Sequence, residues 1–458
     1  MGGNPKGRLM SSVLDRYASR ATPRYTSYPT APHFQKDFAE PRYRDWLARL
    51  DPAAPVSLYL HVPFCRQMCW YCGCNMKLAA RYEPVAEYAA TLRREIALTA
   101  AALPGRMTIS HLHWGGGTPT ALTPDDLAML MAEVRAHWDF APDAEIAIES
   151  DPRTLTAEMA ARIGALGFTR ASFGVQEFDM RVQKAINRVQ PPAMVRQSVE
   201  QLRAAGVSGI NFDLIYGLPH QTVESLVETV RLSAEMRPDR IALFGYAHVP
   251  WMAKNQRMIE DAALPGAEAR RAQAQAAACA LEAAGYLAIG LDHFALPHDG
   301  LAVAAREGRM RRNFQGYTTD QAETLVALGA TSIGRTPSGY VQNIAETGAW
   351  SRAVLEGRLP VGKGLPFIED DRLRAEVIER LMCDGHVDVA AIGAKHGAPA
   401  GWWEDARPAL EEMQADGLLT LAGAQLRMTA LGRPLVRIAA AAFDAYLPSS
   451  TARHSVAV

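Results

Sequence analysis

The apolar positions of this chain alternate between short runs typical of buried strands and longer stretches with helical spacing. The short runs predict strands at residues 56–61, 111–114, 145–149, 170–176, 210–215 and 240–246, with another near residue 286. The longer stretches predict helices at residues 85–102, 122–138, 155–166, 194–205, 223–236 and 267–284. Repeated strand–helix units predict a parallel α/β fold. About six units before the last are fewer than the eight of a complete TIM barrel.

The regions on either side of this series have a different pattern. Residues 1–50 form a polar arm whose segment at 23–30, bracketed by two prolines, has neither helical nor strand spacing. After about residue 366 the pattern predicts helices at 371–381 and 403–415, a small hairpin within 417–432 with its turn at Ala422-Gly423, and a last helix ending near 446. The expected domains are therefore an arm (1–50), an α/β domain with its extension (51–365) and a mostly helical C-terminal domain (366–458).

Composition and charge narrow the class of protein. The 458 residues are 48% hydrophobic and 21% charged, which is ordinary for a soluble globular protein. A net charge of −1 gives no electrostatic case for binding nucleic acid or an anionic membrane. The sequence contains no apolar run of transmembrane length and no apolar signal core at its start. We therefore expect a cytoplasmic protein without nucleic-acid or membrane partners. The predicted C-terminal hairpin also lacks the stripe of basic residues that is typical of nucleic-acid-binding proteins.

Cysteine spacing is the most specific feature of the sequence. Four of the six cysteines, Cys65, Cys69, Cys72 and Cys74, lie within ten residues, and the first three follow the pattern C-x3-C-x2-C. Thiolates suit zinc or iron–sulfur clusters. Structural zinc sites usually use two separated pairs of ligands. Three cysteines on one loop would instead leave one iron of a four-iron cluster open, so we favour an iron–sulfur cluster over zinc.

Other polar positions follow the predicted strands where each one ends. The cysteine loop follows the first strand and a glycine run at 115–117 follows the second, while Glu149 and Gln176 end the third and fourth. Asp213 lies late in the fifth strand, and residues 246–248 follow the sixth. Functional groups of parallel sheets gather at the carboxyl ends of the strands. We therefore expect an active site at this rim.

Taken alone, each of these residues also has an ordinary structural explanation. A glycine run allows the backbone to approach a ligand, but it is more often a tight turn. Glu149 can accept hydrogen bonds from a ribose or an ammonium group, or it can simply be a solvated carboxylate at a strand end. Arg188 suits a carboxylate ligand, because its guanidinium is a rigid multidentate donor.

The cysteine motif, with an aromatic residue before its third cysteine, resembles that of the radical S-adenosylmethionine (SAM) superfamily. The fourth cysteine, the segment at 23–30 and the stretches at 291–295 and 312–319 resemble more narrowly the oxygen-independent coproporphyrinogen III oxidase family. This resemblance covers nearly the whole chain. It implies an α/β fold with an open, six-unit (β/α) partial TIM-type barrel, an N-terminal arm at the substrate pocket and a mostly helical C-terminal domain.

The resemblance also implies the site residues. Cys65, Cys69 and Cys72 would bind a [4Fe–4S] cluster, and Cys74 would be required for catalysis without binding iron. Arg24 and Tyr25 would be catalytic or substrate contacts in the arm. The implied contacts to one SAM molecule, or to two, are Tyr59, Tyr71, Gly116, Gly117, Thr118, Glu149, Gln176, Arg188, Asp213, Ala247 and Ile333. Tyr71 departs from the Phe that is frequent there in related sequences.

The activity implied is the oxidative decarboxylation of two propionates of coproporphyrinogen III to vinyl groups, giving protoporphyrinogen IX in porphyrin and haem biosynthesis. A 5′-deoxyadenosyl radical would remove hydrogen from the propionate β-carbon. The resemblance further implies a monomer and a reductant such as flavodoxin or ferredoxin. Two alternatives stay open at this point, a related haem-binding chaperone and a zinc-stapled binding protein.

Overall fold

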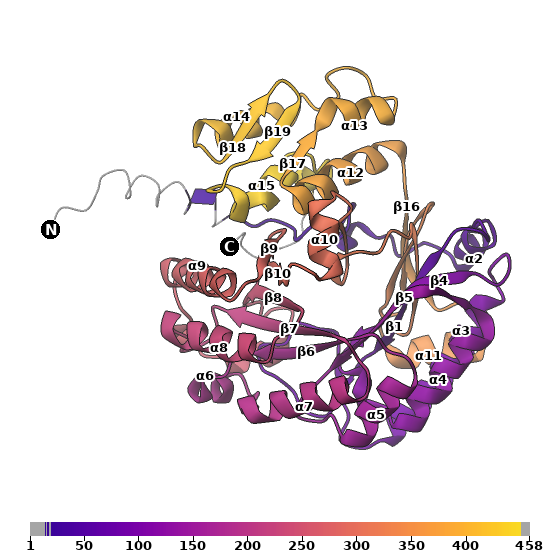
Figure 1. The fold of residues 1–458 in the computed structure, drawn as a ribbon. Coiled ribbons are helices and arrows are strands. Elements are labelled where there is room, and N and C mark those ends of the chain that lie inside the picture. The colour runs from indigo at the N-terminus through magenta and orange to yellow at the C-terminus, as the bar shows by residue number, and fades with distance from the viewer. Residues whose placement is uncertain (1–13, 15, 18–19, 450–458) are drawn as a thin grey trace.

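The computed structural model describes residues 14, 16–17 and 20–449, and its centre is a curved twelve-stranded sheet (Figure 1). The strand order is β16-β15-β14-β13-β1-β4-β5-β6-β7-β8-β10-β9. A parallel series of six strands carries the site: β1 (Val56–Val62), β4 (Thr108–Gly116), β5 (Asp139–Ser150), β6 (Arg170–Gln176), β7 (Gly209–Tyr216) and β8 (Arg240–Gly245). The open partial barrel is thus confirmed, and the strand predicted at 170–176 has the same bounds in the structure.

Helices cover the outer face of this series (Figure 1). They are α3 (Glu83–Ala100), α4 (Pro124–His137), α5 (Ala157–Ala165), α7 (Pro192–Ala204), α8 (Val223–Glu235) and α9 (Ala267–Ala283). Three of them begin where a threonine hydroxyl accepts a backbone N–H, at Thr123, Thr156 and Thr222. Their apolar faces bury Leu92 and Leu127 completely against the sheet. The alternating units predicted from the sequence are therefore present, with bounds shifted by a few residues.

The sheet extends beyond β1, which the apolar pattern did not predict. Strand β13 (Thr324–Leu328) pairs in parallel with β1, and β14 (Ile333–Thr336), β15 (Gly339–Asn343) and β16 (Val361–Pro366) continue antiparallel from it. These strands are short, and β13 finds its parallel partner far away in the sequence. The short strand predicted near residue 286 is β9 (Leu287–Ile289). Further elements that were not predicted include β2 (Phe64–Cys65), β3 (Lys77–Leu78), α6 (Met180–Ala185), β10 (His293–Ala295), α10 (Gly300–Arg306), β11 (Arg311–Asn313), β12 (Gly316–Thr318) and α11 (Thr347–Leu355).

The C-terminal domain packs around its own apolar core. It contains α12 (Glu369–Asp384), β17 (His386–Asp388), α13 (Val389–Lys395), α14 (Arg407–Ala415), β18 (Leu419–Ala422), β19 (Gln425–Met428) and α15 (Val436–Ala441). The helix predicted at 403–415 begins only at Arg407, where a proline occupies the first turn. The predicted hairpin turn was wrong by one residue, because Ala422 pairs with Gln425 and leaves Gly423-Ala424 as the turn.

The N-terminal arm joins the two cores. Tyr25 and Tyr28 belong to the C-terminal core, and the Tyr25 hydroxyl donates to Asp444 Oδ2 over 2.9 Å. Further on, α2 (Glu40–Ala48) buries Trp46 and Leu47 in the core of the barrel. The arm therefore connects the two domains along one surface. No helix in the described part of the chain has the length and apolar content needed to cross a membrane.

A buried carboxylate fastens the parallel series to its extension. Glu95 of α3 is 1% exposed and accepts hydrogen bonds from Gly329 N (2.8 Å), Asn343 Nδ2 (2.6 Å) and Trp350 Nε1 (3.0 Å). Burial raises the pKa of Glu95 to about 7, although these three donors oppose the shift. One side chain thus connects α3 to β15, α11 and the turn after β13.

We expect Glu95→Ala to lower the free energy of unfolding by roughly 3–5 kcal/mol, because three buried donors lose their acceptor. Glu87→Ala is the matched control, since Glu87 is exposed on the same helix, and it should change stability by less than about 0.5 kcal/mol. Thermal melting of both variants measures the difference. Equal melting temperatures would contradict a structural role for Glu95.

Candidate functional site

The cysteine loop follows β1 at the carboxyl end of the sheet, as predicted. Cys69 is buried, Cys65 and Cys72 are half-buried and Cys74 is exposed, and none of the four is in a disulfide. Strands β2 and β3 pair in parallel on either side of the loop and bring its two ends together. Within the described ranges, no three His, Cys, Asp or Glu side chains are grouped closely enough to hold a single metal ion.

Hydrogen-bond donors surround the cysteine sulfurs. Arg153 Nη2 and Arg188 Nη1 each lie 3.3 Å from Cys69 Sγ, and Cys74 N donates to Cys72 Sγ over 3.4 Å. The Thr118 hydroxyl lies 3.4 Å from Cys65 Sγ. Cationic and N–H donors stabilise thiolates, and hydrogen bonds of this kind tune iron–sulfur clusters. The donor set therefore fits thiolate ligands of a cluster.

A buried acidic residue holds the two arginines in place. Asp151 Oδ2 accepts from Arg153 Nη2 over 2.6 Å and from Arg188 Nη1 over 3.3 Å. Burial tends to raise the pKa of Asp151, but Arg188 and Arg153 hold it below its usual value. Arg188 was predicted from the sequence. Asp151 and Arg153 were not, although they lie shortly after Glu149 at the end of the same strand.

A second segment, the short 3-10 helix Lys254–Met258, binds the backbone carbonyls of the cysteine loop. Asn255 Nδ2 donates to the carbonyl oxygens of Cys69 (3.1 Å), Trp70 (3.2 Å) and Cys72 (2.8 Å). Gln256 Nε2 donates to Tyr71 O over 2.8 Å and to Ala247 O over 3.2 Å, and so links two of the predicted SAM contacts. Asn255 and Gln256 lie in a short 3-10 helix without any apolar period, so the sequence carried no signal for them.

The glycine run lies directly against the cysteine strand. A Cβ atom on Gly117 would come within 2.8 Å of the Phe64 backbone, and one on Gly116 would come within 2.8 Å of the His61 ring. Gly116 has a φ of +119°, which other residues rarely adopt. Gly117 N also donates to Val62 O over 2.9 Å. Close packing therefore requires glycine at these positions. Without side chains, the backbone of the glycine run stays accessible to a ligand at the rim.

Polar side chains of adjacent strands meet beside this run. His113 Nε2 lies 3.2 Å from Glu149 Oε1, and Gly116 N donates to Glu149 Oε2 over 3.2 Å. The Tyr59 hydroxyl lies 2.9 Å from His61 Nδ1, and the ring of Tyr59 stacks on that of His113. The structure thus brings together Tyr59, Gly116 and Glu149, all predicted as SAM contacts, and adds two histidines that the sequence analysis missed.

The next two strands contribute buried acceptors. Gln176 is 7% exposed, has a φ of +67°, and its Oε1 atom is buried without a hydrogen-bond partner in the described structure. Burial, followed by the negative charge of Glu149, raises the pKa of Asp213 to about 7. An unpartnered buried amide oxygen and a strained backbone are typical of a position that a ligand completes.

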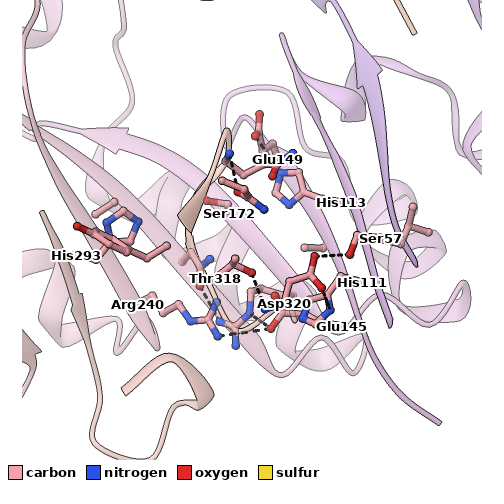
Figure 2. A pocket seen from close by; sticks show the side chains of 18 of the residues that line it. Ser57, His111, His113, Glu145, Glu149, Ser172, Arg240, His293, Thr318 and Asp320 are labelled. Carbon is pink, nitrogen blue, oxygen red and sulfur yellow. Dashed lines mark hydrogen bonds and ion pairs between the residues drawn. The ribbon is translucent and has the colours of Figure 1, made fainter. Parts of the chain in front are cut away.

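His113, Glu149 and Asp213 line a cavity of about 190 Å³ inside the curved sheet. Figure 2 shows Glu149 and His113 at one end of it and Glu145, Arg240 and Asp320 at the other. The deep end is closed by ion pairs that connect Arg170 to Glu145 (3.1 Å) and Arg240 to Asp299 (2.7 Å). The interior of the barrel is therefore polar and charged, unlike the packed apolar interior of a complete TIM barrel.

Two groups of predicted residues lie apart from this rim cluster. Tyr25 packs in the C-terminal core, and Arg24 beside it is exposed. Ile333 of β14 packs against Phe34 and Tyr340. The roles given to these residues, like the ligand roles along the rim, stay predictions.

Comparison with known proteins supplies the family. Residues 59–233 match the radical SAM superfamily and residues 369–435 match the HemN C-terminal domain. The chain is 51% identical to the oxygen-independent coproporphyrinogen III oxidase of Bradyrhizobium diazoefficiens, over 98% of this chain and 100% of the relative. It belongs to the oxygen-independent coproporphyrinogen III oxidase family. The same name is carried by a relative from Salmonella typhimurium, which is 40% identical over 95% of each chain.

A solved member of the family has the same fold. The coproporphyrinogen III oxidase of Escherichia coli, described as a radical SAM enzyme, superposes with a TM-score of 0.89 at 38% identity, covering 92% of this chain and 97% of its own. The cofactors of the superfamily are a [4Fe–4S] cluster and SAM. The thiols, their donors and the unpartnered Gln176 oxygen fit these two groups.

We expect Gly117→Ala to abolish SAM cleavage or to reduce it by at least about tenfold, because the new methyl group would push the backbone at Phe64 out of place. Gly73→Ala is the control, since nothing lies within 4 Å of a Cβ atom at Gly73 in the cysteine loop. The assay is release of 5′-deoxyadenosine from SAM under reducing, anaerobic conditions. A fully active Gly117→Ala variant would show that the close approach is unnecessary.

We expect Asn255→Ala to weaken cluster retention, because three carbonyls of the cysteine loop lose their shared donor. Iron and sulfide per chain should fall by about half or more after desalting. Lys254→Ala, an exposed neighbour, should retain the wild-type content. The prediction fails if both variants hold as much iron as the wild type.

Proposed function

We propose that this chain catalyses the oxygen-independent oxidative decarboxylation of two propionate side chains of coproporphyrinogen III to vinyl groups, giving protoporphyrinogen IX. One observation carries this proposal. The cysteine loop, the glycine run and the rim carboxylates converge at one end of the barrel, in a chain that matches relatives of this activity over almost its full length. The reaction would belong to porphyrin and haem biosynthesis.

The thiols of Cys65, Cys69 and Cys72 would hold the [4Fe–4S] cluster. When bound, the cluster and SAM supply an electron and a radical that can remove hydrogen from a propionate β-carbon. Arg153 and Arg188 donate hydrogen bonds to Cys69 Sγ, and these two cations stabilise its thiolate form. Cys74 lies beside these ligands, where its backbone N–H donates to Cys72 Sγ. We assign it a role in catalysis without iron binding.

The rim would hold SAM through complementary polar groups. Glu149 is fixed by His113 and by Gly116 N, and its carboxylate can accept from an ammonium or ribose hydroxyl group. The buried Gln176 oxygen offers a further acceptor. Burial and the charge of Glu149 raise the pKa of Asp213 to about 7, and a bound sulfonium or ammonium cation would favour its ionised form. A ligand with positive charge and hydroxyl groups would therefore complement Glu149, Gln176 and Asp213.

The reaction also requires partners. One electron must enter for each SAM cleaved, and we propose a small electron-carrier protein such as flavodoxin or ferredoxin as the donor. The cluster loop is close enough to the surface for such a donor, since Cys74 and its neighbours Gly73 and Asn75 are exposed. We propose that the enzyme acts as a monomer, as the resemblance to its family implies.

The test is an anaerobic assay of iron-reconstituted protein with SAM, a reductant and coproporphyrinogen III, with porphyrin products identified by mass. The wild type should form the monovinyl and divinyl products. Cys69→Ala and Cys74→Ala should each lose activity by at least about a hundredfold. Cys279→Ala is the control, since this exposed cysteine of α9 lies outside the site, and it should remain active. If the protein cleaved SAM but formed no vinyl products, the assignment of coproporphyrinogen III as its substrate would be wrong. If the purified protein were colourless and contained zinc, the proposed radical chemistry would be wrong.

A further inference from the structure

Four arginines from separate segments converge where the arm and C-terminal domain meet the barrel. They are Arg24 of the arm, Arg270 of α9, Arg312 of β11 and Arg437 of α15, here called the arginine quartet. Arg437 fastens the arm, because its Nε donates to Pro23 O over 3.0 Å and its Nη2 donates to Thr22 O. Arg312 Nη2 donates to Arg24 O over 3.4 Å. Backbone carbonyls of residues 22–24 in the arm thus hold Arg312 and Arg437 close to Arg24.

Two carboxylates lie near the quartet. Asp292 faces Arg312 and Arg437, and it also lies 2.7 Å from His293 Nδ1. Glu379 Oε1 accepts from Arg312 N over 3.1 Å, and it also pairs with Arg311 Nε over 2.8 Å. Burial together with the charges of Arg24 and Arg312 lowers the pKa of Arg437 to about 10. Cations gathered in this way repel one another, and the free energy of that repulsion falls when an anion binds between them.

Two members of the quartet have donor atoms to spare. Nε and Nη1 of Arg312 and Nε of Arg270 are buried without a hydrogen-bond partner in the described structure. An aromatic ring lies next to each guanidinium, since Arg312 Cζ lies 4.4 Å from the centre of the Tyr317 ring and Arg270 Cζ lies 5.9 Å from that of Tyr216. Planar, oriented guanidiniums with free donors are suited to carboxylates.

The quartet lies at the same end of the barrel as the cysteine loop. Arg270 Nη2 donates to Tyr246 O over 2.9 Å, and Tyr246 directly precedes the predicted SAM contact Ala247. Gly245 leaves space there, because a Cβ atom on it would lie 2.8 Å from the Tyr216 hydroxyl and 3.3 Å from Arg270 Nη2. Arg312 also lines a cavity of about 510 Å³ between the barrel and the C-terminal domain.

We propose that the arginine quartet is a carboxylate-binding site that holds propionates of the tetrapyrrole substrate, an inference that rests on the proposed function. Coproporphyrinogen III has four propionates, and two of them do not react. Binding these two at the quartet would fix the ring at one edge and leave the reacting side chains toward the cysteine loop.

The test is a binding titration with the stable porphyrin coproporphyrin III, followed by its absorbance or by quenching of protein fluorescence. The variants are Arg270→Gln, Arg312→Gln and Arg312→Lys. Each Gln variant should raise Kd by about tenfold or more, and the Lys variant by less, because it keeps the charge without the planar donors. Arg358→Gln is the control, since Arg358 is exposed, pairs with Glu356 and lines neither of the two cavities. The tetramethyl ester of coproporphyrin should not compete.

Iron content and thermal melting identify any variant that fails to fold, and Arg270→Gln carries the test if Arg312→Gln is such a variant. Unchanged Kd in both Gln variants, or equal binding of the ester, would overturn the quartet as a carboxylate site. The proposed function would survive that result if the wild type still forms vinyl products from coproporphyrinogen III. A wild type that neither binds coproporphyrin nor forms these products would overturn both proposals.

Discussion

Close contact between two adjacent strand ends governs the rest of the site. In the β1·β4 register, His61 is opposite Gly115 and Val62 is opposite Gly116, so the glycine run begins where the cysteine loop leaves the sheet. The Gly117 N–H then bonds to Val62 O. A side chain at Gly116 or Gly117 would collide with the ring of His61 or with the Phe64 backbone. The absence of side chains at residues 115–117, where β4 ends, therefore sets the path of the loop that carries the cysteines.

Burial around this contact explains the polar groups beside it. Asp151 is retained among apolar neighbours because Arg153 and Arg188 neutralise it, and the same two cations face Cys69. The charges at the deep end of the barrel are paired as well. Gln176 Oε1 at the rim and donor atoms of Arg270 and Arg312 in the quartet are among the buried side-chain atoms of the described structure that have no hydrogen-bond partner. Buried polar groups are normally satisfied, so each of these atoms is available to a ligand.

Much of the fold followed from apolar spacing because its parallel units are local and regular. The strand at 170–176 and the helices around it bury one face each, and such patterns are readable without tertiary information. The strands β13 to β16 were missed because they are short and their pairing partner β1 is far away in sequence. Helix α6 is only six residues long, too short for a period to be recognised.

The site was predictable where residue type itself carries chemistry, as with the cysteines, the glycine run and Glu149. Asn255 and Arg153 could not be found in this way, because their importance depends on the carbonyls and sulfur that folding brings to them. Tyr25 was predicted as a catalytic residue or substrate contact from the resemblance, and that role stays a prediction. The structure adds that its hydroxyl donates to Asp444 in the C-terminal core.

The most direct test of the central claim is the fate of one hydrogen atom. Coproporphyrinogen III deuterated at the propionate β-carbons would be turned over anaerobically, and the 5′-deoxyadenosine released would be analysed by mass. Transfer of deuterium into 5′-deoxyadenosine, in step with vinyl formation, is the predicted result. Unlabelled 5′-deoxyadenosine, or vinyl products formed without it, would contradict the assignment of this rim as the site of radical decarboxylation.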